Sequence, residues 1–141
     1  MKLGICLSFG GNCKQAVEFY AKVFGATDVL IMKFGDMPPM PGREEMNEED
    51  KAKICHAEMT ILDQKVIFSD LLGEEHVSGT NMVLSLTSSD EGEIRKAFEQ
   101  LSEGATIQIP LGKTFFSTAF GTLTDMFGTK WHLTAQGENQ N

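Results

Sequence analysis

Residues 3 to 27, LGICLSFGGNCKQAVEFYAKVFGAT, carry the pattern that decides the fold. Residues 3 to 9 are typical of a β-strand, and the two glycines that follow interrupt it before a helix. Asn12 is a residue type that caps helix starts, and Gln15 stands at the capping-box position three residues later. Apolar residues then recur every three or four positions up to Phe24, so one face of the helix is predicted to be buried. Gly25 is expected to end the helix in the left-handed conformation.

The end of this helix is repeated further along the chain. Four residues recur 79 positions later: Phe19, Gly25, Ala26 and Thr27 correspond to Phe98, Gly104, Ala105 and Thr106. Both sets lie where a helix ends and the next strand begins, as a duplicated supersecondary unit requires. The sequence therefore predicts two copies of one unit.

The first unit is predicted to continue with three strands. They cover residues 28 to 34, 54 to 61 and 66 to 70, with a turn at Asp63 and Gln64. The stretch from residue 35 to 53 holds most of the prolines and a dense run of acidic residues, so we predict a long mobile loop there. Loops of this length are often functional, and this one is either a lid over a site or a solvated excursion.

The second unit is predicted to begin near Thr80, because apolar residues alternate from Met82 to Leu86 as in a half-buried strand. Ser88, Ser89 and Asp90 offer caps for a helix that Gly104 stops. Strands near residues 106 to 110, 115 to 124 and 129 to 134 complete the unit. We thus predict one domain over residues 1 to 141, with module one at about 1 to 72, module two at about 79 to 136, and a disordered tail at 137 to 141.

Composition and charge argue against several classes of function. A chain of 141 residues, 41% of them hydrophobic, is the size of one domain with a real core. The formal net charge of −8 means that the average surface repels nucleic-acid phosphates and anionic lipid. The sequence has neither the roughly 20 consecutive apolar residues of a membrane span nor the features of a signal peptide. We therefore expect a cytoplasmic protein without nucleic-acid or membrane partners.

Five motifs, in this order, resemble the vicinal-oxygen-chelate superfamily, the glyoxalase and bleomycin-resistance class, and especially its PhnB-like branch. They are SFGGNCKQAVEFYAKVFGA, FGDMPPMPG, HAEMTI, FSD and LTDMFGTKWHL. The resemblance covers nearly the whole chain. It implies an α+β fold in which two βαβββ modules pair into a curved mixed sheet around a shared cavity, and it also implies a homodimer.

In the metalloenzymes that this chain resembles, four inward side chains hold a divalent metal, which acts as a Lewis acid. The resemblance places these ligand positions at or near Ile5, Phe68, Asn81 and His132. Only His132 is a good ligand, whereas a Zn-, Ni- or Fe-type ion needs three or more imidazole, thiolate or carboxylate donors. We therefore expect no metal and no other cofactor. A divalent metal is the alternative, because a register shift of one residue would turn Cys6 inward.

Strand alternation gives an independent view of the cavity, because successive strand side chains point to opposite faces of a sheet. With Cys55, Ala57, Met59 and Ile61 packed on helices, His56 and Glu58 face the cavity, and Trp131 and Leu133 likewise leave His132 facing it. The full predicted pocket consists of His56, Glu58, Phe68, Asn81, Ser85, Phe116 and His132. Apolar walls with a few convergent polar groups are common in small-molecule sites.

These polar residues are open to two interpretations. His56 and His132 are either hydrogen-bonded parts of their strands or proton-transfer groups, and Glu58 is either exposed, paired with a nearby lysine, or an acid–base partner of His56. His56, Glu58 and His132 are thus the candidate catalytic residues.

Two functions follow from these interpretations. The chain is a small-molecule-binding protein that lacks the superfamily's complete metal site, or it is a metal-dependent lyase, isomerase or dioxygenase acting on a small organic substrate. Relatives in this branch are sometimes labelled methyltransferases. That activity is disfavoured here, because the sequence lacks the glycine-rich strand-to-helix loop, with an acidic residue about 20 positions on, that holds a nucleoside cofactor.

Overall fold

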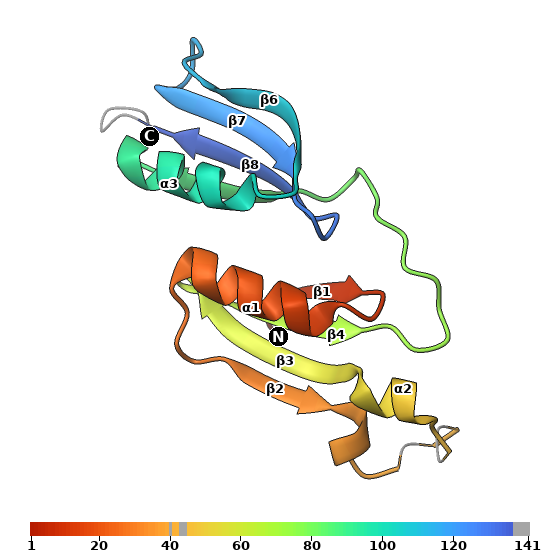
Figure 1. Cartoon of the computed structure of the whole chain (residues 1–141). Coiled ribbons are helices and arrows are strands. Elements are labelled where there is room, and N and C mark those ends of the chain that lie inside the picture. Colours follow the sequence, from red (N-terminus) through yellow and green to blue (C-terminus); the bar gives the residue numbers. More distant parts are fainter. Residues whose placement is uncertain (40, 43–44, 137–141) are drawn as a thin grey trace. The chain divides into compact units, whose positions relative to one another are not determined.

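The computed structural model describes residues 1 to 39, 41 to 42 and 45 to 136, and the chain divides into two compact units, Met1–Val77 and Ser78–Asn141. Each unit is a βαβββ module with one four-stranded mixed sheet (Figure 1). The predicted α+β class and the two copies of one unit are confirmed. The tail predicted at residues 137 to 141 lies outside the described residues.

Module one contains one long helix and four strands: β1 (Ile5–Phe9), α1 (Cys13–Phe24), β2 (Leu30–Lys33), β3 (Ile54–Ile61) and β4 (Gln64–Asp70). The strand order is β1-β4-β3-β2, with β1 parallel to β4 and the other neighbours antiparallel. Helix α1 lies along one face of this sheet (Figure 1), because its apolar stripe of Ala16, Val17 and Tyr20 is fully buried. The ring of Tyr20 stacks on Phe68 of β4, with ring centroids 6.0 Å apart.

Helix α1 does not use the cap that the sequence predicts. The side chain of Asn12 makes no capping hydrogen bond. Instead, Asp70 at the end of β4 accepts hydrogen bonds from the backbone N–H groups of Gly11 (2.9 Å) and Cys13 (3.0 Å) through Oδ1. Its Oδ2 accepts a bond from the N–H of Ile54 at 2.9 Å. A buried carboxylate at this place accepts hydrogen bonds from free N–H groups, and its negative charge is stabilised by the positive end of the helix dipole. A residue at the end of β4 therefore replaces the local cap.

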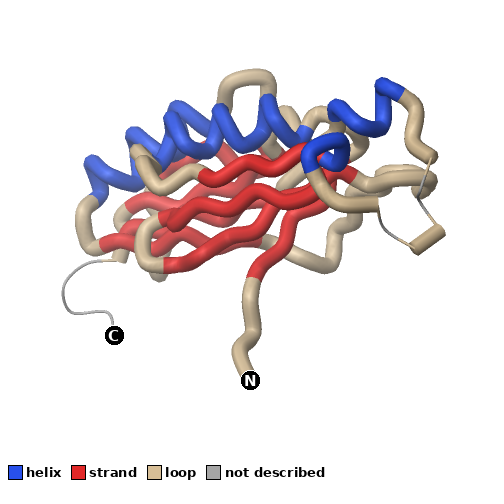
Figure 2. Tube along the Cα trace, turned by 90° about the horizontal axis from the view of Figure 1, so that it is seen from below, coloured by secondary structure: helices blue, strands red, loops and turns tan. Residues whose placement is uncertain are grey.

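Module two repeats the arrangement with β5 (Leu84–Ser88), α3 (Glu91–Leu101), β6 (Thr106–Gly112), β7 (Ala119–Thr124) and β8 (Lys130–Ala135). Its strand order, β5-β8-β7-β6, matches that of module one. Helix α3 has the predicted local cap, because Asp90 Oδ1 accepts hydrogen bonds from the N–H groups of Gly92 and Glu93. Figure 2 follows the helices, strands and loops along the Cα trace.

Three predicted elements differ from the structure. The loop predicted at residues 35 to 53 contains most of a 3-10 helix, η1 (Phe34–Asp36), and a short helix, α2 (Glu48–Ala52), which Asn47 caps through the N–H of Asp50. Strand β5 begins at Leu84 and not near Thr80, so Asn81 lies in a bend before it. Strand β7 begins at Ala119, and Phe116 lies in the preceding loop, where a hydrogen bond from Thr114 N–H to Ser117 O replaces strand pairing. The lid function stays a prediction.

Candidate functional site

Each sheet has one face packed on the helix of its own module and one face that this helix does not cover, here called the open face. On β3, Ala57, Met59 and Ile61 are buried toward α1, which leaves His56, Glu58 and Thr60 on the open face. On β8, Trp131 and Leu133 are buried toward α3, which leaves His132 on the open face. The predicted alternation is confirmed from His56 to Ile61 and along β8. At the start of β3 it is wrong, because the pairing with β2 shifts register there, so that Ile54 is buried and the predicted Cys55 is only half-buried.

Strand register extends these faces across both sheets, because side chains of directly paired residues share a face. In module one, one row of paired residues runs across β2, β3, β4 and β1: Leu30, Glu58, Ile67 and Cys6. In module two, the matching row runs across β6, β7, β8 and β5: Ile109, Thr122, His132 and Ser85. These two rows are the centres of the open faces.

The open face of module one carries a network of three polar side chains. His56 Nε2 lies 3.0 Å from Glu58 Oε2, and Lys65 Nζ lies 3.1 Å from Glu58 Oε1. The hydrogen bond from His56, followed by that from Lys65, holds the pKa of the Glu58 carboxyl below its ordinary value. Glu58 is therefore both paired with a lysine and joined to His56, two interpretations that the sequence left open.

The open face of module two carries an aromatic series that ends at His132. The ring centroids of Phe115 and Phe116 lie 5.1 Å apart, those of Phe116 and Phe120 lie 5.1 Å apart, and Phe120 lies 5.9 Å from the imidazole of His132. All three contacts are edge-to-face. Phe115 is 97% exposed and Phe116 is 42% exposed, so the series presents ring surface to solvent within its module.

Two of the predicted pocket residues are placed elsewhere by the structure. Phe68 pairs with Ala57 in register and is fully buried against Tyr20, so it faces the helix and not the open face. Asn81 precedes β5 and is exposed. The prediction failed for Phe68 because the face of a strand residue depends on its pairing register, which the sequence of β4 alone does not reveal.

The structure brings His56 and Glu58 together in module one, and it places Ser85 beside His132 on neighbouring strands of module two. Phe116 joins the module-two group through Phe120. The convergence of all these residues on a shared cavity stays a prediction. Lys65 was not predicted to lie on the open face. Lys65 lies two residues before Ile67 on β4, so strand alternation could have placed both side chains on the same face.

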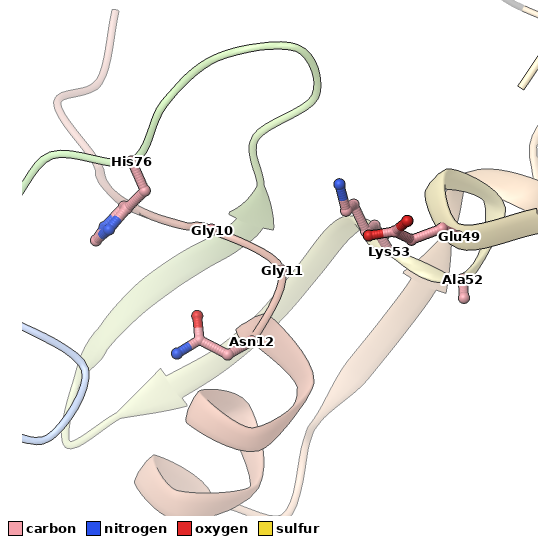
Figure 3. Close-up of a pocket in the computed structure, with 7 residues that line it drawn as sticks. All are labelled: Gly10, Gly11, Asn12, Glu49, Ala52, Lys53 and His76. Carbon is pink, nitrogen blue, oxygen red and sulfur yellow. The ribbon is translucent and has the colours of Figure 1, made fainter. Parts of the chain in front are cut away.

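A further cavity of about 610 Å³ lies at the start of α1 in module one (Figure 3). The lining residues come from three segments that are distant in sequence: Gly10, Gly11, Asn12, Glu49, Ala52, Lys53 and His76. The charge of Lys53 is met by Asp50, whose Oδ1 lies 3.1 Å from its Nζ. Sequence reasoning missed this cavity because no local pattern connects the three segments.

The register also corrects the metal positions that the resemblance implied. In module one, the open face carries Cys6 instead of Ile5 and Ile67 instead of Phe68. In module two, it carries Ser85 instead of Asn81, and His132 lies on it as expected. One imidazole, one thiol, one hydroxyl and one alkyl group do not make the donor set of a Zn-type ion. Within either module, the described residues contain no group of three or more His, Cys, Asp or Glu side chains that could hold a metal.

Residues 1–134 match the family model described as 3-demethylubiquinone-9 3-methyltransferase. The chain belongs to this family. Protein YjdN from Escherichia coli (strain K12) is 30% identical over 140 residues, which cover 94% of each chain. Among solved structures, protein PA1353 from Pseudomonas aeruginosa has a TM-score of 0.82 at 30% identity, with 97% of this chain and 100% of that chain covered.

A second solved relative links this family to PhnB. It is a PhnB protein from Bacillus cereus, described as a putative 3-demethylubiquinone-9 3-methyltransferase, with a TM-score of 0.77 at 27% identity and coverage of 96% and 99%. A mutant of the fosfomycin resistance protein FosX from Listeria monocytogenes, complexed with Mn(II) and 1S,2S-dihydroxypropylphosphonic acid, has a TM-score of 0.66 at 11% identity, with coverage of 99% and 95%. That likeness concerns the fold alone. The chain is thus a PhnB-like protein with the vicinal-oxygen-chelate fold.

Two further properties were predicted from the sequence. Among the described residues, no helix is both long enough and apolar enough to cross a membrane. The homodimer and the cytoplasmic location stay predictions.

Proposed function

We propose that this PhnB-like protein binds a small organic ligand on the open face of its module-two sheet, with the aromatic series as the main contact. The observation that carries the proposal is the exposure of Phe115 and Phe116 in a series of rings that leads to His132. Phenylalanine rings usually lie in the core, and exposed apolar groups rimmed by polar ones are typical of binding surfaces.

The residues around the series suggest how a ligand would be held. The rings of Phe116 and Phe120 would pack against a planar or apolar part of the ligand. His132 and Ser85 are paired on neighbouring strands of the sheet and offer an imidazole and a hydroxyl to polar groups of the ligand, whereas Thr122 of the same row is buried. Apolar rings beside a few polar groups are what small-molecule sites commonly contain.

The fold relative FosX supports this proposal in a general way, since its mutant is complexed with a small organic acid and Mn(II). The metal-dependent alternative fits this chain less well, because its corresponding positions offer Cys6, Ile67, Ser85 and His132. We do not propose methyl transfer, despite the description of the family model. The backbone N–H groups at the start of α1, which a doubly wound fold would use for a nucleoside cofactor, are bonded to Asp70.

The proposal is tested by ¹⁹F NMR with a library of trifluoromethyl-substituted aromatic fragments. We expect the resonances of some fragments to broaden in the presence of the native protein and to sharpen again with Phe116→Ala or His132→Gln. Leu62→Ser is the matched control, because Leu62 is also an exposed apolar side chain but belongs to a turn of module one, whereas the aromatic series belongs to module two. Circular dichroism verifies that each variant is folded. The proposal is wrong if no fragment broadens, or if the same fragments bind Phe116→Ala and His132→Gln as well as the native protein.

A further inference from the structure

The polar network on the open face of module one has the parts of a proton-transfer site. Glu58 uses one carboxylate oxygen for the imidazole of His56 and the other for the ammonium of Lys65. Between 26% and 61% of each of the three side chains is exposed, so a small molecule can reach them. We infer that His56 is a general base for small carbonyl compounds, with Glu58 as its positioning residue and Lys65 as the group that stabilises the product oxyanion.

The contact with Glu58 determines which imidazole nitrogen is basic. An ionised carboxylate only accepts hydrogen bonds, so a neutral His56 must carry its proton on Nε2, the atom that lies 3.0 Å from Glu58 Oε2. Nδ1 then keeps its lone pair. A base that is oriented by a third group in this way is the general arrangement of catalytic dyads and triads.

Lys65 completes the arrangement by holding the second oxygen of Glu58. An ammonium group has three N–H donors, so Lys65 can hold Glu58 Oε1 at 3.1 Å and still donate to an oxygen atom of a ligand. A base and a cation thus share one carboxylate on one face of the sheet. This combination suits the removal of a proton from a carbon next to a carbonyl group, because the negative charge that develops on the carbonyl oxygen needs a donor.

The proposed step is balanced without any further reactant. Nδ1 of His56 takes the proton from the carbon, the C–H electron pair forms the new C=C bond, and the carbonyl π electrons move to oxygen. The enolate oxygen accepts a hydrogen bond from the Lys65 ammonium. Return of a proton from His56 to carbon regenerates the compound, and in D₂O that proton is replaced by deuterium. The inference rests on the proposed function only in that an open face of this kind admits small organic molecules.

The test measures incorporation of deuterium into dihydroxyacetone in D₂O by ¹H NMR, with the full chain. We expect the native protein to accelerate exchange well above free imidazole at the same concentration, and we expect His56→Gln to lower the rate at least tenfold. His76→Gln is the matched control, because His76 is a partly buried imidazole of module one outside the network, and it should exchange like the native protein. The inference is overturned if the native protein is no faster than free imidazole, or if His56→Gln is as active as the native protein.

A second readout separates positioning from mere folding. The ¹⁵N chemical shifts of the His56 ring should show the proton on Nε2 in the native protein, and Glu58→Gln should populate the Nδ1–H form and slow exchange, because an amide can also donate. Glu58→Asp should recover part of the rate. An unchanged ring tautomer in Glu58→Gln would contradict the role of Glu58. Fragment binding to the aromatic series should not change in His56→Gln, so failure of the proton transfer is distinguishable from failure of the proposed binding.

Discussion

The two modules start their helices in different ways, although their topology is the same. Helix α3 is capped by Asp90, the residue directly before it, whereas α1 is capped by Asp70, which lies 57 residues from Cys13. A local cap can be recognised in the sequence, and a cap from a neighbouring strand cannot. The comparison shows that a duplicated fold conserves the need to satisfy the first N–H groups of its helix without conserving the residue that does so.

The open faces of the two modules also share their geometry but not their side chains. Leu30 and Cys6 correspond to Ile109 and Ser85, each pair 79 residues apart, so the register of the two sheets is duplicated. The side chains at the paired positions are not duplicated. The position that holds His132 in module two holds Ile67 in module one, and the position of Glu58 in module one is taken by Thr122. Each module therefore carries its own set of functional groups.

The largest expected effect comes from Asp70. Asp70→Asn places an amide N–H₂ group among buried N–H donors, so we expect the free energy of unfolding to fall by about 3 kcal/mol. Asp90→Asn is the matched variant, and its loss should be much smaller, because asparagine is an equally good local cap. Urea denaturation followed by circular dichroism measures both. Equal losses of stability in the two variants would contradict the difference between the cap of α1 and the cap of α3.

A smaller effect is expected from Gly121 of β7, whose counterpart in the register of module one is Ala57. A Cβ atom on Gly121 would lie 2.7 Å from Phe98 Cε2 and 3.0 Å from Leu111 Cα. Gly121→Ala should therefore lower stability by about 2 kcal/mol through overpacking, even though the other module accommodates alanine at this position. Thermal denaturation of Gly121→Ala, with Gly4→Ala as a control in open space, measures this. A melting temperature equal to that of the control would contradict the packing difference.

The smallest effect is the pH dependence contributed by Glu58. Because its pKa is lowered in the folded state, Glu58 stabilises the protein above its ordinary pKa of 4.5, and this contribution is lost as the pH falls through the lowered value. The stability difference between the native protein and Glu58→Gln should thus be present above pH 4.5 and vanish in acid. Thr122→Val, at the corresponding position, should give a pH-independent difference. Parallel pH profiles for the two variants would show that the His56–Glu58–Lys65 network does not form.

Features with a local signal could be predicted from the sequence. The bounds of β3, the cap at Asp90 and the open-face position of His132 follow from alternation and capping residues within a few positions. Features set by pairing could not. The side on which Phe68 lies depends on its register with Ala57, and the cap at Asp70 depends on where β4 ends. The contact between Lys65 and Glu58 is diagonal across two strands, so it also required the register.

The ligand-binding role of the module-two open face is tested most directly by chemical-shift mapping. A fragment that binds in the ¹⁹F experiment is titrated into ¹⁵N-labelled protein, and the largest amide and side-chain shifts are recorded. We expect them at Phe116, Phe120 and His132, with the helix side of the same sheet, at Trp131 and Leu133, much less affected. Shifts centred on helix α3, or on the cavity at the start of α1, would contradict the account.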